Sequence, residues 1–161
     1  STEFESEEEK LAYESRTLSY EPNMGKVVGK HQGAHFFTIG QRKGLNIGGK
    51  PQPLFVLQTN VHENVIYVGQ GENHKALFSA GLVIKSSEAH WVRPSQKRVV
   101  LQSKDLLCRI RYRQALFECH LVEAENGDML LYFNEMQKSV TAGQFAAIYL
   151  KDELVFSGVI S

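Results

Sequence analysis

Short runs of β-type residues separated by turn residues fill most of this 161-residue chain, and they constrain its fold more than any other feature. Asn126-Gly127, a strong signal for a tight hairpin, separates two of them. Many short strands at this spacing are typical of barrels and sandwiches rather than of a parallel α/β sheet. We therefore predict an all-β protein with strands at 26–28, 35–39, 54–59, 65–68, 81–85, 99–103, 107–113, 116–123, 129–133, 145–150 and 154–160.

The length allows one medium domain or two small ones, and the polar segment 70–80 is the best candidate for a boundary. An acidic lead segment, 1–21, is expected to be disordered or to form a short helix near 7–16. A small central β module would then span 22–78, and a C-terminal antiparallel β-barrel would span 79–161. The chain begins with Ser rather than Met, which suggests a processed start or a fragment.

The balance of charge excludes a strongly cationic protein, because 18 Lys and Arg residues offset 18 Asp and Glu residues. Binding of nucleic acid would therefore depend on local patches. No apolar run is long enough to span a membrane and no signal peptide is evident, so we expect a cytoplasmic protein without a membrane partner. No internal repeat is apparent.

The loop Gly40-Gln41-Arg42-Lys43-Gly44 places an amide and two cations between glycines that permit a tight turn. Such a loop suits a phosphate or a carboxylate. A polar turn with solvated charges is the equally supported alternative.

The predicted strand 107–113 alternates strictly, which would place Arg109, Arg111 and Arg113 on one face and Tyr112 on the other. Three guanidinium groups in a row could follow a phosphate backbone. Cross-strand pairing of these arginines with Glu118 or Glu123 is the slightly favoured alternative from the pattern alone.

Other chemically reactive residues indicate structural roles. Cys108 and Cys119 fall on inward faces of neighbouring strands, as buried free thiols do. His31 and His35 would lie roughly 13 Å apart on an extended segment, and no zinc-binding pattern accompanies them, so no metal site is expected. Trp91 is expected to anchor the barrel core. Phosphate-binding loops of the Rossmann and Walker types are absent from the sequence.

Three motifs together resemble a known family. The segment His31-Gln32-Gly33 to Leu45, the strand Cys108 to Arg113, and Val140-Thr141-Ala142-Gly143-Gln144 follow the order and spacing of the bacterial tRNA-specific 2-thiouridylases, also described as tRNA (5-methylaminomethyl-2-thiouridylate) methyltransferases. The resemblance covers roughly residues 25 to 160 and departs from the family where Ala142 replaces a proline and Asn46 a glycine.

The resemblance implies a small central β module and a C-terminal barrel like domain 2 of translation factors. It also implies that this chain is a non-catalytic fragment, since the family's N-terminal ATP-pyrophosphatase domain, which uses ATP and Mg²⁺, has no counterpart here. The expected partners are tRNA, that catalytic domain and a sulfur-relay donor protein. A stand-alone RNA- or protein-binding barrel without thiolase activity is the alternative.

The resemblance further implies which residues meet tRNA. Arg111, Tyr112 and Gln144 match the family's contacts, and Arg109 and Arg113 extend them. Gln41, Arg42 and Lys43 would lie at the junction with the catalytic domain or contact phosphates. Both Arg111 and Tyr112 can reach RNA only if the strand ends or twists sharply near them.

Overall fold

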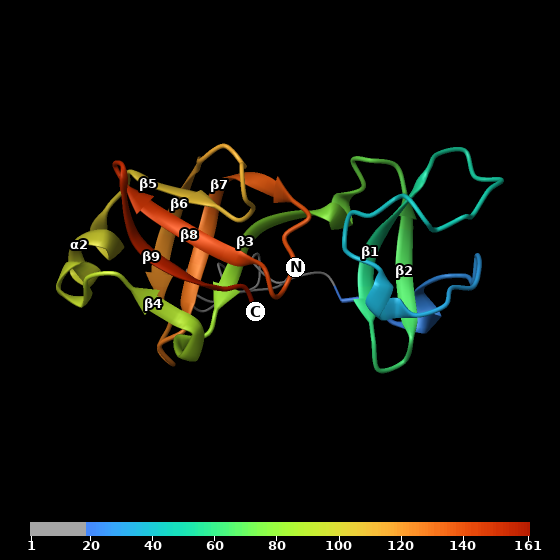
Figure 1. Cartoon of the computed structure of the whole chain (residues 1–161), viewed down its shortest axis with the longest axis horizontal. Helices are drawn as coiled ribbons and strands as arrows, with labels where there is room; N and C mark the ends of the chain where they lie inside the picture. Colours follow the sequence, from blue (N-terminus) through green and yellow to red (C-terminus); the bar gives the residue numbers. More distant parts are fainter. Residues whose placement is uncertain (1–18) are drawn as a thin grey trace, which may run out of the picture. The chain divides into compact units, whose positions relative to one another are not determined.

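The computed structural model describes residues 19–161, so the predicted lead helix at 7–16 lies outside the described part. The described residues fall into two compact units, 19–78 and 79–161 (Figure 1).

The first unit is built on an antiparallel hairpin of β1 (Leu54–Asn60) and β2 (Val65–Gln70). The turn at 61–64 joins the two strands, and Asn64 closes it with φ 55°. The hairpin buries its apolar face in a small core of Leu45, Leu54 and Val56, against which Phe37, Ile47, Ile66 and Val68 pack. Three short 3₁₀ helices complete the unit: η1 (Pro22–Met24), η2 (Ala34–Phe36) and η3 (Lys75–Leu77).

Two strands predicted for this unit are wrong. Residues 26–28 are extended outside any sheet and exposed, because a β-prone valine pair gains little without a partner strand and a buried face. At 35–39 the chain instead coils into η2, where the N–H groups of Phe36 and Phe37 donate to Gly33 and Ala34.

The second unit is a seven-stranded sheet in the order β3-β7-β6-β5-β8-β9-β4 (Figure 1). Short helical segments connect some strands: η4 (Ser86–Glu88), η5 (Pro94–Gln96) and α2 (Lys97–Gln102). The strands are β3 (Phe78–Ile84), β4 (Ala89–Trp91), β5 (Leu106–Arg109), β6 (Phe117–Glu123), β7 (Met129–Lys138), β8 (Phe145–Leu150) and β9 (Glu153–Val159).

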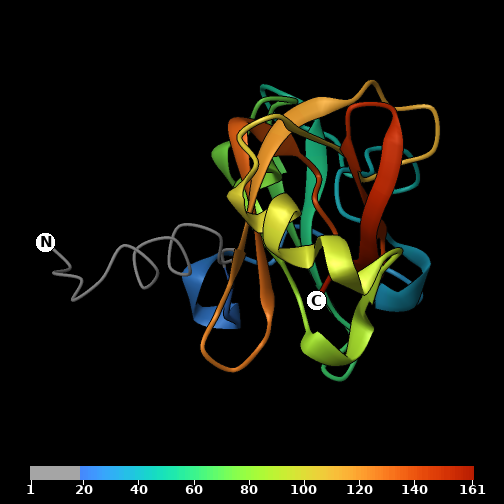
Figure 2. The same ribbon diagram turned by 90° about the vertical axis from the view of Figure 1, so that its left-hand side faces the viewer.

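The sheet of the second unit is curled (Figure 2), and the residue that follows Ile160 after β9 bonds to β3. The N–H of Ser161 donates to the carbonyl of Val83 at 2.9 Å. Gly158 lies beneath Ile84, where a Cβ atom would approach the Ile84 side chain to 2.5 Å, so only glycine permits this contact. The expected all-β fold with a curled antiparallel barrel is therefore confirmed.

The interior of the second unit is one apolar cluster that runs from Leu82 to Ile160. Cys108 and Cys119 are fully buried in it on the adjacent strands β5 and β6, which confirms their structural placement. Trp91 packs at 4.7 Å on Phe156 at the edge of the core, as predicted. Gly127 takes φ 84° in the hairpin between β6 and β7, where Asn126-Gly127 predicted a turn.

The predicted strand at 99–103 is also wrong, because this segment forms α2. Pro94 opens the preceding turn η5, and a proline at a first helical position is pre-set for helix. The helix buries Val100 and leaves Val99 exposed, and Lys97 forms an ion pair with Glu123. No helix in residues 19–161 is both long and apolar enough to cross a membrane.

Candidate nucleic-acid interface

The predicted arginine strand ends early, at Arg109. Beyond it, the N–H of Gln114 donates to the carbonyl of Arg111, and Arg113 takes the left-handed conformation with φ 63°. The side chain of Gln114 accepts the N–H of buried Ile110 at 2.9 Å and fixes the base of the turn. The prediction of three arginines on one strand face is therefore wrong, and a turn at 111–114 replaces the ladder.

Arg111 does not form the predicted pair with an acid on β6. Its guanidinium group donates to the backbone carbonyl of Lys138 and, at 2.7 Å, to that of Ser139. Glu123 is paired with Lys97, and Glu118 accepts a hydrogen bond from Asn134. Arg111 thus joins the turn after β5 to the loop after β7.

The other two arginines stack on tyrosine rings. The guanidinium carbon of Arg109 lies 5.6 Å from the ring centre of Tyr149, and that of Arg113 lies 5.4 Å from the ring centre of Tyr112. Tyr112 is 88% exposed, so its outer ring face is open to a ligand. The turn places Arg111, Tyr112 and Arg113 together, which an extended strand would have prevented.

Gln144 lies beside this turn, in a tight turn of its own. The side-chain oxygen of Gln144 accepts the N–H of Thr141 at 3.1 Å, and its own N–H donates back to the Thr141 carbonyl. The N–H of Gly143 and the carbonyl of Gln144 bond to Ile160. Within residues 19–161 the Nε2 atom of Gln144 has no acceptor, so its two N–H donors remain available.

The first unit contains the same turn. In Thr38-Ile39-Gly40-Gln41, the Gln41 side chain accepts the Thr38 N–H at 3.0 Å, and Gly40 and Gln41 bond to the backbone of Val56 on β1. Gly40 and Gly143 take φ 85° and 89°, conformations that favour glycine. This four-residue repeat was not predicted, although the pattern Thr-x-Gly-Gln occurs at both places in the sequence.

The Gly40–Gly44 loop differs from the second turn in one respect. Here the Nε2 atom of Gln41 donates to the Lys43 carbonyl at 2.8 Å, so both ends of the amide brace the loop. The side chains of Arg42 and Lys43 are exposed beyond it. The two cations, and not Gln41, are therefore the groups in this loop that are positioned to meet an anion.

Charge is segregated at the end of the barrel that carries Arg111 and Gln144. The three segments that adjoin there, 107–116, 136–150 and 154–161, contain no Asp or Glu. They contribute Arg109, Arg111, Arg113 and Lys138. Among residues 19–161, none of these three arginines forms an ion pair with a carboxylate. Such a surface suits an anion with flat, stackable groups, a description that fits nucleic acid.

Neither cysteine offers an alternative chemistry. A hydrogen bond with Cys119, followed by burial, raises the pKa of the Cys108 thiol well above its ordinary value, so the reactive thiolate is disfavoured. In the described part of the chain, no three His, Cys, Asp or Glu side chains gather where they could hold a metal ion.

The structure thus brings Arg109, Arg111, Tyr112, Arg113 and Gln144 to one end of the second unit. Gln41, Arg42 and Lys43 belong to the first unit. Phe145, which was not among the predicted site residues, directly follows Gln144 and is 62% exposed. Its alternation with buried Ala146 and Ile148 was a signal that it faces outward.

Comparison with known sequence families supports both units. The tRNA methyl transferase PRC-barrel domain matches residues 10–70, and the aminomethyltransferase β-barrel domain matches residues 82–160.

The similar curated proteins are tRNA-specific 2-thiouridylases MnmA. The chain is 53% identical to that of Flavobacterium johnsoniae over 154 residues, which cover 96% of this chain and 39% of the relative. It is 50% identical to that of Christiangramia forsetii over 98% of this chain and 40% of the relative. It is 40% identical to that of Karelsulcia muelleri over 91% of this chain and 38% of the relative. The chain spans about two fifths of the length of these relatives, and it belongs to the tRNA-specific 2-thiouridylase family, matching its central and C-terminal domains.

Proposed function

We propose that this chain is the tRNA-binding and positioning portion of an enzyme that 2-thiolates the wobble uridine of tRNA in an ATP-dependent reaction. The carrying observation is the convergence of the 111–114 turn and the 138–144 loop within segments, 107–116 and 136–150, that contain no Asp or Glu. The names of the relatives, matched over nearly the whole chain, favour this function over a stand-alone binding module.

Each residue of this end would have a distinct part in holding tRNA. Arg113 and Arg111 would face phosphates, and Arg109 would add charge beside them. Tyr112 would offer its open ring face to a sugar or base. Gln144 would donate through Nε2, because its oxygen is already engaged by Thr141.

The chemistry itself is assigned to the part of the longer relatives that this chain does not match. Binding of ATP and Mg²⁺ is proposed for that same part of the longer relatives. The proposed partners are that catalytic domain, through the Gly40–Gly44 loop, and a sulfur-relay protein that would dock on the same domain. Arg42 and Lys43 would contact RNA phosphates at the junction with that domain. A cytoplasmic location is proposed because the substrate would be tRNA.

A titration of labelled tRNA tests the proposal with Arg113→Gln and Arg111→Ala. Arg113→Gln is the cleaner probe, because Arg111 also holds the 138–139 backbone. Loss of one phosphate contact should weaken binding and reduce the slope of log K against log salt by about 1. Arg98→Gln, an exposed charge on α2, is the control and should not change the slope.

If the wild-type chain binds tRNA with no salt dependence, or if all three variants bind as the wild type does across salt concentrations, the proposed interface is wrong.

A further inference from the structure

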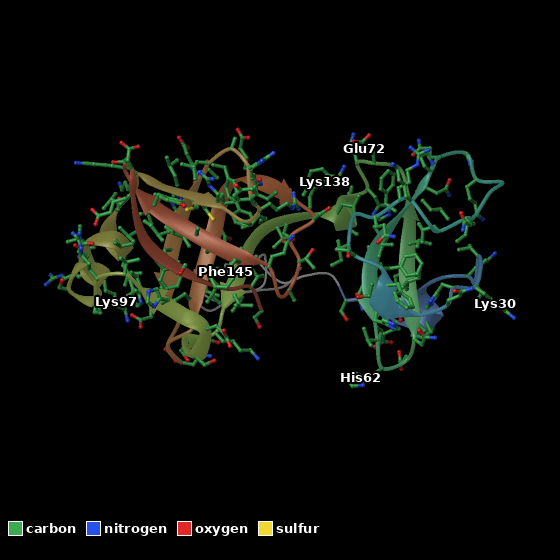
Figure 3. The ribbon with its side chains drawn as sticks, viewed as in Figure 1. Lys30, His62, Glu72, Lys97, Lys138 and Phe145 are labelled. Carbon is green, nitrogen blue, oxygen red and sulfur yellow. The ribbon has the colours of Figure 1, made fainter. Side chains whose placement is uncertain are left out.

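Phe145 is the first residue of β8, and its side chain points away from the barrel interior. It is 62% exposed, whereas Ala146 and Ile148 are fully buried. Strand alternation therefore places Phe145, Ala147 and Tyr149 on one outward face. Figure 3 labels Phe145 on this strand. A large apolar ring in water costs free energy of hydration, so its exposure requires an explanation.

The strand register places this ring beside the arginine turn. Arg109, the last residue of β5, pairs with Ala147, which lies two residues from Phe145 at the start of antiparallel β8. The 111–114 turn therefore follows β5 at the same end of the sheet at which Phe145 begins β8. On the other side, Phe145 pairs with Val159 of β9. Gln144 immediately precedes it. The phenyl ring thus lies among the proposed tRNA contacts and within the segments that lack carboxylates.

The residues around Phe145 indicate which kind of ligand its ring would contact. The outward neighbours of Phe145 are small: Ala147, Ser157 and Val159. One ring with such neighbours offers far less apolar area than the roughly 800 Å² per partner of a stable protein interface. Exposed aromatic rings, here Phe145 and Tyr112, beside arginines that form no ion pair with a carboxylate among residues 19–161 are instead the combination that binds single-stranded nucleic acid. In such binding, cations follow the phosphates and rings stack on bases.

We propose that Phe145 is a positioning residue that stacks on an unpaired base of bound tRNA, next to phosphates held by the 111–114 turn. The base must be unpaired, because both faces of a base within a helix are covered by its neighbours. This inference rests on the proposed tRNA-binding function and adds a residue that contributes by stacking rather than by charge.

The test measures binding of labelled tRNA by the whole chain carrying Phe145→Ala, Phe145→Leu, Phe145→Tyr or Phe145→Trp. The Ala and Leu variants should weaken affinity by about 5- to 150-fold, the effect of losing one stacked base. The Tyr and Trp variants should keep affinity within about threefold of wild type, because they retain a π face. The salt slope should stay unchanged in all four, unlike in Arg113→Gln.

Two controls complete the design. Val99→Ala removes another exposed apolar side chain, 59% exposed on α2, and should leave affinity unchanged. A fully paired RNA duplex should bind wild type and Phe145→Ala equally. Denaturant midpoints of the Phe145 variants should match wild type, since the ring is on the surface.

The outcomes separate this inference from the proposed function. If wild type binds tRNA with a normal salt slope but Phe145→Ala binds equally well, stacking is overturned while the tRNA interface stands. Equal affinity of Phe145→Leu and wild type would also overturn stacking, as would a change in self-association by sedimentation without a change in RNA affinity. If wild type does not bind tRNA at all, the proposed function itself fails.

Discussion

Gln41 and Gln144 occupy the same position of the same turn, but their amide nitrogens differ in what they contact. Both side-chain oxygens accept a threonine N–H. Only Gln41 also donates its Nε2 to a backbone carbonyl, that of Lys43. One glutamine is therefore fully used by its loop, whereas the other retains donors that a ligand can use.

A glutamate at each position should separate structure from binding. Gln41→Glu keeps the acceptor but loses the Lys43 bond, so the free energy of unfolding should fall by about 1 kcal/mol. Gln144→Glu loses no bond within the described residues and should change stability by less than about 0.5 kcal/mol. It should weaken tRNA binding, because a carboxylate cannot donate and repels phosphate.

Urea unfolding and tRNA titration of both variants check this contrast. Equal stability losses would show that the two turns are held alike, and unchanged tRNA affinity of Gln144→Glu would remove Gln144 from the interface.

Cys108 should make stability decrease in alkaline solution. Its pKa is raised above the ordinary 9.0, first by the hydrogen bond with Cys119 and then by burial. The folded state therefore holds its proton more tightly than the unfolded state does. The stabilisation is complete below about pH 9 and is lost as pH rises, by up to about 1.4 kcal/mol per pH unit for this thiol.

Denaturant unfolding between pH 8 and pH 10.5 tests this prediction. Cys108→Ala is expected to be less stable at pH 8 but to lose stability less steeply above pH 9 than wild type. Parallel pH profiles for the two proteins would contradict the prediction.

Among the elements, α2 is an apolar run whose sequence pattern predicted a strand but which folds as a helix. The segment Val99-Val100-Leu101 has high β propensity, and the sequence pattern predicted a strand. The preceding Pro94, the buried Val100 and the ion pair of Lys97 with Glu123 favour a helix instead. A weak local preference was overridden by tertiary packing.

Val99→Ala distinguishes the two structures by the sign of its effect. In a helix, an exposed Ala is favoured over Val, so the free energy of unfolding should stay equal or rise by about 0.5 kcal/mol. In a strand the same change should be destabilising. Urea unfolding measures the difference, with Val100→Ala expected to cost about 2 kcal/mol because Val100 is fully buried.

For the whole molecule, the two units differ in the size of their cores. The apolar cluster of the second unit has 17 buried residues, all between Leu82 and Ile160, whereas that of the first unit has three. A core this small buries little apolar surface and gives marginal stability by itself. We therefore propose domains at 22–78 and 79–161 of unequal stability.

Residues 79–161 expressed alone should fold and unfold in one cooperative transition, with most of the proposed tRNA contacts intact. Residues 19–78 alone should show a broad or absent transition. Circular dichroism during urea unfolding measures both. A fragment 79–161 that lacks a cooperative transition would refute the proposed domain boundary.

The sequence by itself determined the all-β class, most strands, the hairpin at Asn126-Gly127 and the inward cysteines. Each depends on local alternation or turn chemistry, which neighbouring residues encode. The resemblance to the 2-thiouridylases also came from the sequence, because it depends on three motifs and on their order along the chain.

Only the tertiary structure decided where the arginines point. Alternation predicted a ladder because it assumes that a strand continues, but β5 ends at Arg109 and Gln114 closes a turn beyond it. The loop at 138–144 then supplies the carbonyls of Lys138 and Ser139 for Arg111. These contacts join residues about 30 positions apart, and a pattern with a period of two residues carries no information about such pairs.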